Sequence, residues 1–237
     1  MACTYCYQNN KSKNRMDFNT AKHIIDNLLN DDNYYNTHEV NGLILEFIGG
    51  EPFMEIDLIQ RITDYFVSKS IELNHRLLKY FMISVSTNGL LYFDEKVQNF
   101  IQKYKNNFSM TVSIDGNKEL HDTCRVDLNG NGTYDRAIAA ELHYHKTYAN
   151  DLETKMTISP DNVNYIFNAI QNLISLGYVS IQLNCIYEEG WTIEHAKILY
   201  QELKKVADWL LDNDAFRKYR ISMLNAEIFK PMDASET

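Results

Sequence analysis

Short apolar runs of strand length alternate along this chain with amphipathic stretches of helix length. This alternation predicts parallel strands joined by right-handed helical crossovers. Several of the runs are almost continuously apolar, which is typical of a parallel sheet that is covered on both faces. The expected strands cover residues 43–48, 80–85, 108–114, 154–158, 179–185 and 219–224.

The segments between these runs have the spacing of helices. A long amphipathic helix is expected over 193–210, and a shorter one over 165–176. Asp161 or Asn162 can cap the shorter helix, and Gly177 is expected to end it. A doubly wound sheet and a barrel both fit this alternation, and periodicity does not choose between them.

Composition excludes several classes of protein. The chain has 237 residues, with 32 acidic against 23 basic side chains, so it lacks the basic surface of a dedicated nucleic-acid binder. No apolar run approaches the ~20 residues that a membrane-spanning helix needs. The four cysteines do not form the framework of a small disulfide-rich domain, and we therefore expect a cytoplasmic protein.

Polar and glycine-rich turns follow three consecutive expected strands. They are Gly49-Gly50-Glu51-Pro52, Ser86-Thr87-Asn88-Gly89 and Asp115-Gly116. In parallel α/β folds the loops at the carboxyl ends of the strands build the active site. Turns are commonly rich in Gly and Asn, so each of these segments has a purely structural explanation as well.

Cys3 and Cys6 form a C-x-x-C pair at the extreme N-terminus. In a reducing compartment this pair indicates metal, cluster or redox chemistry. Half of a zinc site is one interpretation, although zinc would need two further ligands. A thioredoxin-like redox pair is less favoured, because that motif follows a strand and opens a helix.

An ordered set of motifs resembles the radical S-adenosylmethionine (radical SAM) enzymes. The similarity is greatest to the peptide-modifying maturases of the anaerobic sulfatase-maturase type, which carry a second, cysteine-rich SPASM domain. It extends from residue 1 to about residue 190. The matching segments are Cys3-Thr4-Tyr5-Cys6-Tyr7, Phe47-Ile48-Gly49-Gly50-Glu51-Pro52, Ser86-Thr87-Asn88-Gly89, Ser113-Ile114-Asp115-Gly116, His121-Asp122 with Arg125, Gly130-Asn131-Gly132-Thr133-Tyr134, and Lys155-Met156-Thr157-Ile158.

The resemblance implies a partial (β/α)6 TIM-like barrel with parallel strands and with the first strand of the family missing. Residues 1–225 would form this core, incomplete at its N-terminus. Residues 226–237 would begin a linker toward an absent C-terminal domain.

The resemblance also implies a [4Fe-4S] cluster. Cys3 and Cys6 match the second and third cysteines of the family motif C-x3-C-x2-C, with Tyr5 as the aromatic residue before the last one. The first cysteine of the motif would lie four positions before Cys3 and is absent from this sequence. Three thiolates leave one iron of the cluster open for S-adenosylmethionine.

S-adenosylmethionine itself is the second implied cofactor. The family pattern assigns Gly49, Gly50 and Glu51 to its amino group, and Ser113 and Arg125 to its ribose and carboxylate. Asn88 and Asp115 belong to the same ring of strand ends, with less specific contacts. Ile48 departs from the family, in which many members place a polar residue before the two glycines.

The function implied is reductive cleavage of S-adenosylmethionine to modify a peptide or protein substrate. Flavodoxin or ferredoxin would supply the electron. His121 and Asp122 are interpreted as a structural part of the loop before Arg125, because hydrogen abstraction needs no general base in its first step. The alternative is a non-catalytic remnant or fragment of such a barrel that binds no cluster.

Overall fold

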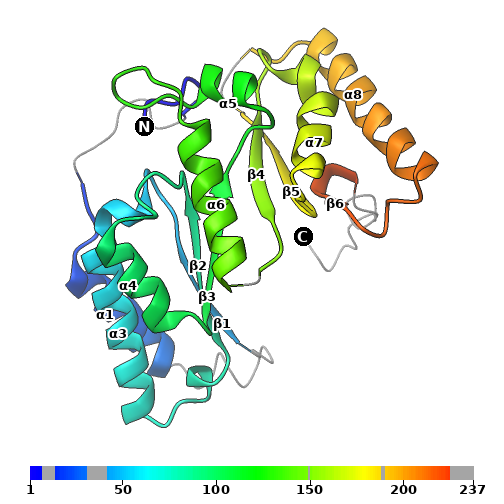
Figure 1. Cartoon of the computed structure of the whole chain (residues 1–237). Coiled ribbons are helices and arrows are strands. Elements are labelled where there is room, and N and C mark those ends of the chain that lie inside the picture. Colours follow the sequence, from blue (N-terminus) through cyan, green and yellow to red (C-terminus); the bar gives the residue numbers. More distant parts are fainter. Residues whose placement is uncertain (7–13, 31–41, 149, 188–189, 225–237) are drawn as a thin grey trace. The chain divides into compact units, whose positions relative to one another are not determined.

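A computed structural model of the chain describes residues 1–6, 14–30, 42–148, 150–187 and 190–224 (Figure 1). The strands are β1 (Leu43–Phe47), β2 (Phe81–Thr87), β3 (Phe108–Ser113), β4 (Glu153–Ile158), β5 (Ser180–Cys185) and β6 (Arg220–Ile221). The α-helices are α1 (Phe18–Asn30), α3 (Ile56–Glu72), α4 (Glu95–Tyr104), α5 (Lys118–Cys124), α6 (Tyr134–Tyr148), α7 (Ile166–Ser175) and α8 (Ile193–Asp212). Short 3-10 helices are η1 (Pro52–Glu55), η2 (Arg76–Leu78), η3 (Val163–Tyr165) and η4 (Ser222–Leu224).

The strands form one six-stranded parallel sheet in the order β1-β2-β3-β4-β5-β6. All six predicted strands are present, but the sixth covers only Arg220–Ile221, and Ser222–Leu224 of the expected range form the 3-10 helix η4. The order runs without the reversal that defines a doubly wound sheet, so it decides in favour of the barrel type of α/β fold. The expected linker, 226–237, lies outside the described residues.

The chain divides into two compact units, a smaller one of residues 8–111 and a larger one of residues 1–7 and 112–237. In the smaller unit, β1 pairs with β2 from Leu43 opposite Phe81 onward. Helix α3 packs on this sheet through Phe66, whose ring lies 5.2 Å from that of Phe81. Helix α3 also lies beside α1 and α4.

Only one face of β2 is fully buried, which corrects the expectation of a sheet covered on both faces. Phe81, Ile83 and Val85 are buried, whereas Met82 between them is 39% exposed. Ile44, opposite Met82 in the register with β1, is exposed as well. The apolar run therefore reflects one packed face and one open face that also carries apolar side chains.

In the larger unit, a buried threonine fixes the register of β4 against the end of β3. The hydroxyl of Thr154 donates to the carbonyl of Val112 (2.8 Å) and accepts from the amide of Ile114 (3.0 Å). Because Ile114 directly precedes the turn at Asp115, this contact also holds the start of that turn. Strand β4 pairs with β5 along its whole length.

Helices α7 and α8 of the larger unit lie side by side (Figure 1). The buried carboxylate of Glu202 on α8 accepts a hydrogen bond of 2.9 Å from the amide of Phe167 in the first turn of α7. An acidic partner at this end of a helix satisfies an amide that has no partner within the helix. Helix α8 thus supplies the acceptor for α7.

The predicted N-terminal cap of α7 is wrong, whereas the predicted end of the helix at Gly177 is confirmed. Asn162 makes no side-chain cap and instead accepts from the amide of Ser159 (2.8 Å) and donates to the carbonyl of Thr157 (3.0 Å). It therefore stabilises the loop that leaves β4. Gly177 follows α7 with φ +96°, a conformation that favours glycine.

None of the helices that the structure describes is long and apolar enough to cross a membrane.

Candidate functional site

The two cysteines of the N-terminal pair lie on one tight turn. The amide of Cys6 donates to the carbonyl of Cys3 over 3.1 Å, which brings both residues to the same end of the turn. Both thiols are free and half-buried. Burial raises the pKa of Cys3, and the nearby guanidinium of Arg125 opposes this rise by favouring the thiolate.

Two backbone hydrogen bonds dock this turn on the segment that contains Arg125. The amide of Ala2 donates to the carbonyl of Val126, and the amide of Thr4 donates to the carbonyl of Cys124, each over 2.9 Å. The two carbonyls belong to the neighbours of Arg125 on either side. The position of the cysteine turn is therefore tied to the backbone around this arginine.

A buried ion pair joins Asp115 to Arg125. Nε of Arg125 lies 2.8 Å from Oδ2 of Asp115, and its Nη2 lies 3.2 Å from Oδ1. Asp115 is fully buried and Arg125 is 8% exposed. Burial disfavours the charged guanidinium, but the carboxylate of Asp115 outweighs this and raises the pKa of Arg125.

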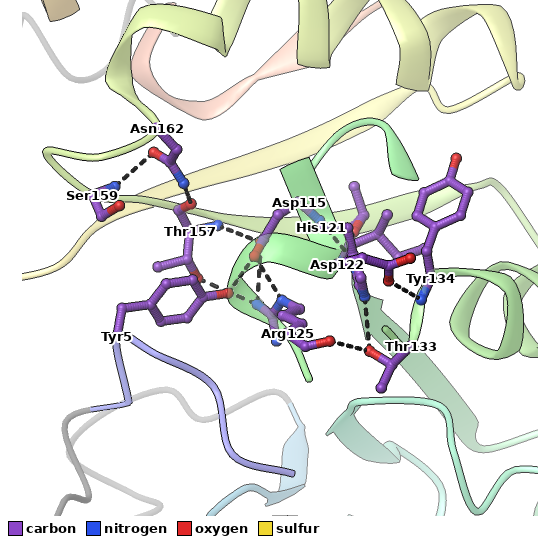
Figure 2. A network of polar contacts seen from close by, with 12 residues as sticks. Tyr5, Asp115, His121, Asp122, Arg125, Thr133, Tyr134, Thr157, Ser159 and Asn162 are labelled. Carbon is purple, nitrogen blue, oxygen red and sulfur yellow. Dashed lines mark hydrogen bonds and ion pairs between the residues drawn. The ribbon is translucent and has the colours of Figure 1, made fainter. Parts of the chain in front are cut away.

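Thr157, near the end of β4, forms hydrogen bonds with both partners of this ion pair. The amide of Thr157 donates to Oδ1 of Asp115 over 2.9 Å, and the hydroxyl of Thr157 accepts from Nη2 of Arg125 over 3.3 Å. The carboxylate of Asp115 is thus held by two charged and one neutral N–H donors, as Figure 2 shows. Bidentate contact between a guanidinium and a buried carboxylate adds geometric specificity to the pair.

Tyr5 connects the cysteine turn to the ion pair. Its hydroxyl donates to Oδ2 of Asp115, and the guanidinium of Arg125 lies 5.5 Å from the centre of its ring (Figure 2). Burial, reinforced by the carboxylate of Asp115, raises the pKa of Tyr5, so its phenol stays neutral. The aromatic residue predicted between the cysteines therefore has a definite role as a hydrogen-bond donor.

Ser113 and Gly116 flank Asp115 at the carboxyl end of β3. Ser113 is the half-buried last residue of the strand and pairs with β4 at Lys155. Gly116 has φ +79°, and a Cβ placed on it would lie only 2.4 Å from Cβ of Ala169 on α7. The turn needs glycine for its conformation and for this close approach.

In the smaller unit, Glu51 forms hydrogen bonds with the carboxyl end of β2. Its carboxylate accepts from the hydroxyl of Thr87 (2.7 Å), the amide of Asn88 (2.9 Å) and the amide of Phe53 (3.1 Å). Burial raises the pKa of Glu51, and these hydrogen bonds oppose the rise by favouring the carboxylate. The structure therefore brings Glu51 and Asn88 together, as two residues of the predicted ring.

Asn88 meets Glu51 through its backbone rather than through its side chain. Its Oδ1 accepts from the amide of Leu90 over 2.9 Å, which stabilises the turn after β2. Gly49 has φ +131°, a conformation that glycine adopts readily, and Gly50 precedes Glu51 directly. The predicted site residues thus form two groups, one in each compact unit.

The residues around the cysteine turn fit part of a cluster site. Thiolates are the ligands of iron–sulfur clusters, and the turn presents two of them at the spacing of the family motif. Among the residues that the structure describes, no group of three or more Cys, His, Asp or Glu side chains could hold a metal ion. The described part of the chain therefore supplies two thiolates of the three that the cluster motif requires.

Sequence reasoning missed two contributors to the site. Thr157 binds both partners of the ion pair, and Asn162 supports Thr157 from the following loop. Thr157 stands in the matched segment Lys155-Met156-Thr157-Ile158 at the end of an expected strand, and this position was the available signal. Asn162 offered only its capping propensity, which pointed to another role.

Known proteins resemble this chain in sequence. It is 30% identical over 184 residues to an uncharacterized protein of Methanocaldococcus jannaschii, covering 78% of this chain and 58% of that protein. It is 31% identical over 144 residues to the cysteine-type anaerobic sulfatase-maturating enzyme of Clostridium novyi, covering 57% and 34%. A second such enzyme, from Clostridium perfringens, is 26% identical over 203 residues, covering 80% and 50%. No family model matches the chain.

Solved structures share the fold. The enzyme anSMEcpe, in a structure with bound AdoMet, superimposes with a TM-score of 0.75 at 21% identity, covering 93% of this chain and 59% of that one. Streptococcus suis SuiB bound to the precursor peptide SuiA gives a TM-score of 0.58 at 15% identity, covering 93% and 45%. The chain thus spans between 34% and 58% of the length of the curated relatives it matches. These similarities confirm the α/β barrel-type fold and the predicted resemblance to anaerobic sulfatase-maturating enzymes.

Proposed function

We propose that this chain, which resembles the anaerobic sulfatase-maturating enzymes, is the core of a radical SAM enzyme that modifies a peptide or protein. The observation that carries the proposal is the hydrogen-bonded set of Tyr5, Asp115 and Arg125, which links a C-x-x-C turn to the carboxyl ends of β3 and β4 (Figure 2). These are the parts that cluster-dependent cleavage of S-adenosylmethionine requires close together.

Arg125 is suited to bind the carboxylate of S-adenosylmethionine. Asp115 and Thr157 occupy Nε and Nη2, while Nη1 makes no hydrogen bond to the residues that the structure describes. A guanidinium fork that is fixed on one edge keeps donors on the other edge for a second carboxylate. Ser113, at the end of β3, is the proposed polar partner for the same cofactor.

Glu51 is suited to bind an ammonium group. Its three donors use three of about four acceptor positions on a carboxylate, and one position remains. The proposal gives this position, together with backbone acceptors at Gly49 and Gly50, to the amino group of S-adenosylmethionine. Asn88 contributes by orienting Glu51 through its amide.

Cys3 and Cys6 are the proposed thiolate ligands of a [4Fe-4S] cluster. When bound, such a cluster supplies the single electron that cleaves the sulfonium of S-adenosylmethionine. Tyr5 fixes the turn between the two thiolates by its hydrogen bond to Asp115, and Arg125 favours the ionised form of Cys3. The protein contributes position and electrostatics, while the bound groups supply the reactivity.

The substrate and redox partner belong to the proposal as well. Two of the relatives are named for maturation of sulfatases, and one structural neighbour is bound to a precursor peptide, which supports a peptide or protein substrate here. Flavodoxin or ferredoxin is the proposed electron donor. The four free thiols suit a reducing compartment such as the cytoplasm.

Equilibrium binding of S-adenosylmethionine tests the assignment of Arg125. The protein is expressed from its complete gene and treated anaerobically with iron and sulfide before the measurement. Arg125→Leu is expected to weaken binding by about tenfold or more, because a charge-assisted contact to the carboxylate is lost. Arg136→Leu is the matched control, since Arg136 pairs with Asp127 on the surface. Equal affinity in Arg125→Leu and Arg136→Leu would contradict the assignment.

A further inference from the structure

A continuous chain of hydrogen bonds runs from the backbone of Asp115 to the backbone of Arg125. The amide of Asp115 donates to Nδ1 of His121 over 3.2 Å, and Nε2 of His121 lies 3.1 Å from the hydroxyl of Thr133. That hydroxyl donates to the carbonyl of Arg125 over 2.7 Å. Figure 2 shows the three contacts beside the ion pair.

The direction of each hydrogen bond fixes the state of the imidazole. Nδ1 of His121 accepts from an amide, so it carries no proton and Nε2 carries the single one. Nε2 then donates to Thr133, whose own proton points to the carbonyl of Arg125. The chain is complete only with a neutral histidine protonated on Nε2.

Burial keeps this histidine neutral. His121 and Thr133 are each 1% exposed, and burial lowers the pKa of His121 to about 4. The groups that face it are the carboxylates of Asp115 and Asp122, which favour its charged form, and the cations of Arg125 and Lys118, which oppose it. The ring of Tyr134 on α6 packs against it edge-on, 5.5 Å away.

The chain closes two loops around the ion pair. One loop runs from Asp115 to His121, and the other runs from Arg125 to Thr133 through the turn that the bridge between Val126 and Gly132 closes. Without the hydroxyl of Thr133, the buried carbonyl of Arg125 would lose its side-chain partner. The arginine would then be held by its side chain, by its own amide at the end of α5 and by the backbone contacts of Cys124 and Val126, with no hydrogen bond to its own carbonyl.

We propose that His121 and Thr133 are positioning residues that clamp the Asp115 amide to the Arg125 carbonyl and so hold the arginine in the orientation that binds S-adenosylmethionine. This inference rests on the proposed function for its ligand. The clamp itself is a property of the protein alone, and it can be measured without any cofactor.

The decisive variants change one hydroxyl. Thr133→Val keeps the shape of the side chain and removes the donor, whereas Thr133→Ser keeps the donor. Thr123→Val is the matched control, because the hydroxyl of Thr123 also donates to a backbone carbonyl, that of Glu119, but lies on the exposed surface of α5. His121→Asn breaks the same chain from its other side, since the shorter side chain does not reach Thr133.

Hydrogen exchange of the Arg125 Nε–H, followed by nitrogen-15 NMR on arginine-labelled protein, tests the clamp without a cofactor. We expect exchange at least about tenfold faster in Thr133→Val and in His121→Asn than in the wild type, and wild-type exchange in Thr133→Ser and Thr123→Val. Wild-type exchange in Thr133→Val, or in His121→Asn if the valine variant does not fold, would overturn the clamp.

Binding of S-adenosylmethionine to the reconstituted protein tests the consequence. At conditions where every variant is fully folded by circular dichroism, Thr133→Val is expected to bind about tenfold more weakly, and Thr133→Ser is expected to restore affinity. Faster exchange with unchanged affinity would overturn the positioning role and leave the two residues a structural part of the loop. Failure of the wild type to bind at all would overturn the proposed function, whereas the exchange result would still decide the clamp.

Discussion

Replacement of Glu141 by Gln is expected to change how the stability of the protein depends on pH. Glu141 lies on α6 and is 1% exposed, and its Oε2 has no hydrogen-bond partner among the described residues. Burial raises the pKa of this carboxyl to about 8, and the carboxylate of Glu153 acts in the same direction. The backbone amides of Val112 and Glu153 oppose the rise without cancelling it.

The sign follows from proton binding in the two states. Between its ordinary pKa near 4.5 and about 8, the folded protein holds a proton on Glu141 that the unfolded chain has released. The stability that the protonated Glu141 contributes to the folded protein is therefore complete below pH 4.5 and is lost as the pH rises toward about 8. The slope is about 1.4 kcal/mol for each pH unit, which gives a loss of about 3 kcal/mol between about pH 5.5 and pH 7.5.

Urea unfolding at several pH values measures this slope. Glutamine resembles the protonated carboxyl and does not ionise, so the Glu141→Gln variant should not show the loss and should gain about 3 kcal/mol relative to the wild type over that interval. Glu119→Gln is the matched control, because Glu119 is exposed on α5 and should follow the wild-type profile. Parallel profiles for Glu141→Gln and the wild type would refute the reasoning, since Glu141 would then ionise in the folded protein as it does in the unfolded chain.

Three further substitutions probe the strand ends, each by urea unfolding. Glu51→Gln should cost about 1–3 kcal/mol, because an amide NH2 would face donors that the carboxylate now accepts; unchanged stability would contradict the hydrogen bonds described. Gly116→Ala should cost about 2 kcal/mol or more through its positive φ and its clash with Ala169, and Ala169→Gly should recover part of that loss; no recovery would argue against the clash. Asp115→Asn should lower the free energy of unfolding by about 3–5 kcal/mol, because it leaves a buried cation without its counter-charge. The same change should cost less when it is made in the Arg125→Leu variant, which has no such cation. Strictly additive losses would disprove the coupling.

The sequence was sufficient to predict the strands because each one is encoded locally. The run 43–48 became β1 (Leu43–Phe47), and 108–114 became β3 (Phe108–Ser113), with ends displaced by one residue. Hydrophobic periodicity reports such segments directly. The order of the strands depends on pairing between distant segments, so periodicity did not distinguish a barrel-type sheet from a doubly wound one. The family motifs implied the barrel, and the strand order of the structure agrees with it.

Motifs located the candidate site, but they did not reveal how its residues bind one another. Asp115 was expected to touch a cofactor, and in the structure its carboxylate is occupied by Arg125, Thr157 and Tyr5. Tyr5 is 110 positions away in the chain, so no local pattern could indicate this contact. Residue type and spacing therefore identified the participants, while their hydrogen bonds required the fold.

Buried polar groups were the hardest features to foresee. Glu141 occurs in a helix, and a charged side chain in a helix is ordinarily expected to be solvated. His121 and Thr133 stand in matched motifs, but their joint contact to the backbone of Arg125 depends on the turn between them. In each case burial by another element, rather than local sequence, determines the chemistry of the side chain.

Formation of 5′-deoxyadenosine from S-adenosylmethionine tests the central proposal most directly. The protein is expressed from its complete gene, reconstituted anaerobically with iron and sulfide, and reduced with dithionite. Cys6→Ala is compared with Cys185→Ala, which removes a thiol at the end of β5, outside the N-terminal turn. We predict product from the wild type and from Cys185→Ala and none from Cys6→Ala. No product from a wild type that holds its cluster, or equal product from Cys6→Ala, would contradict the account.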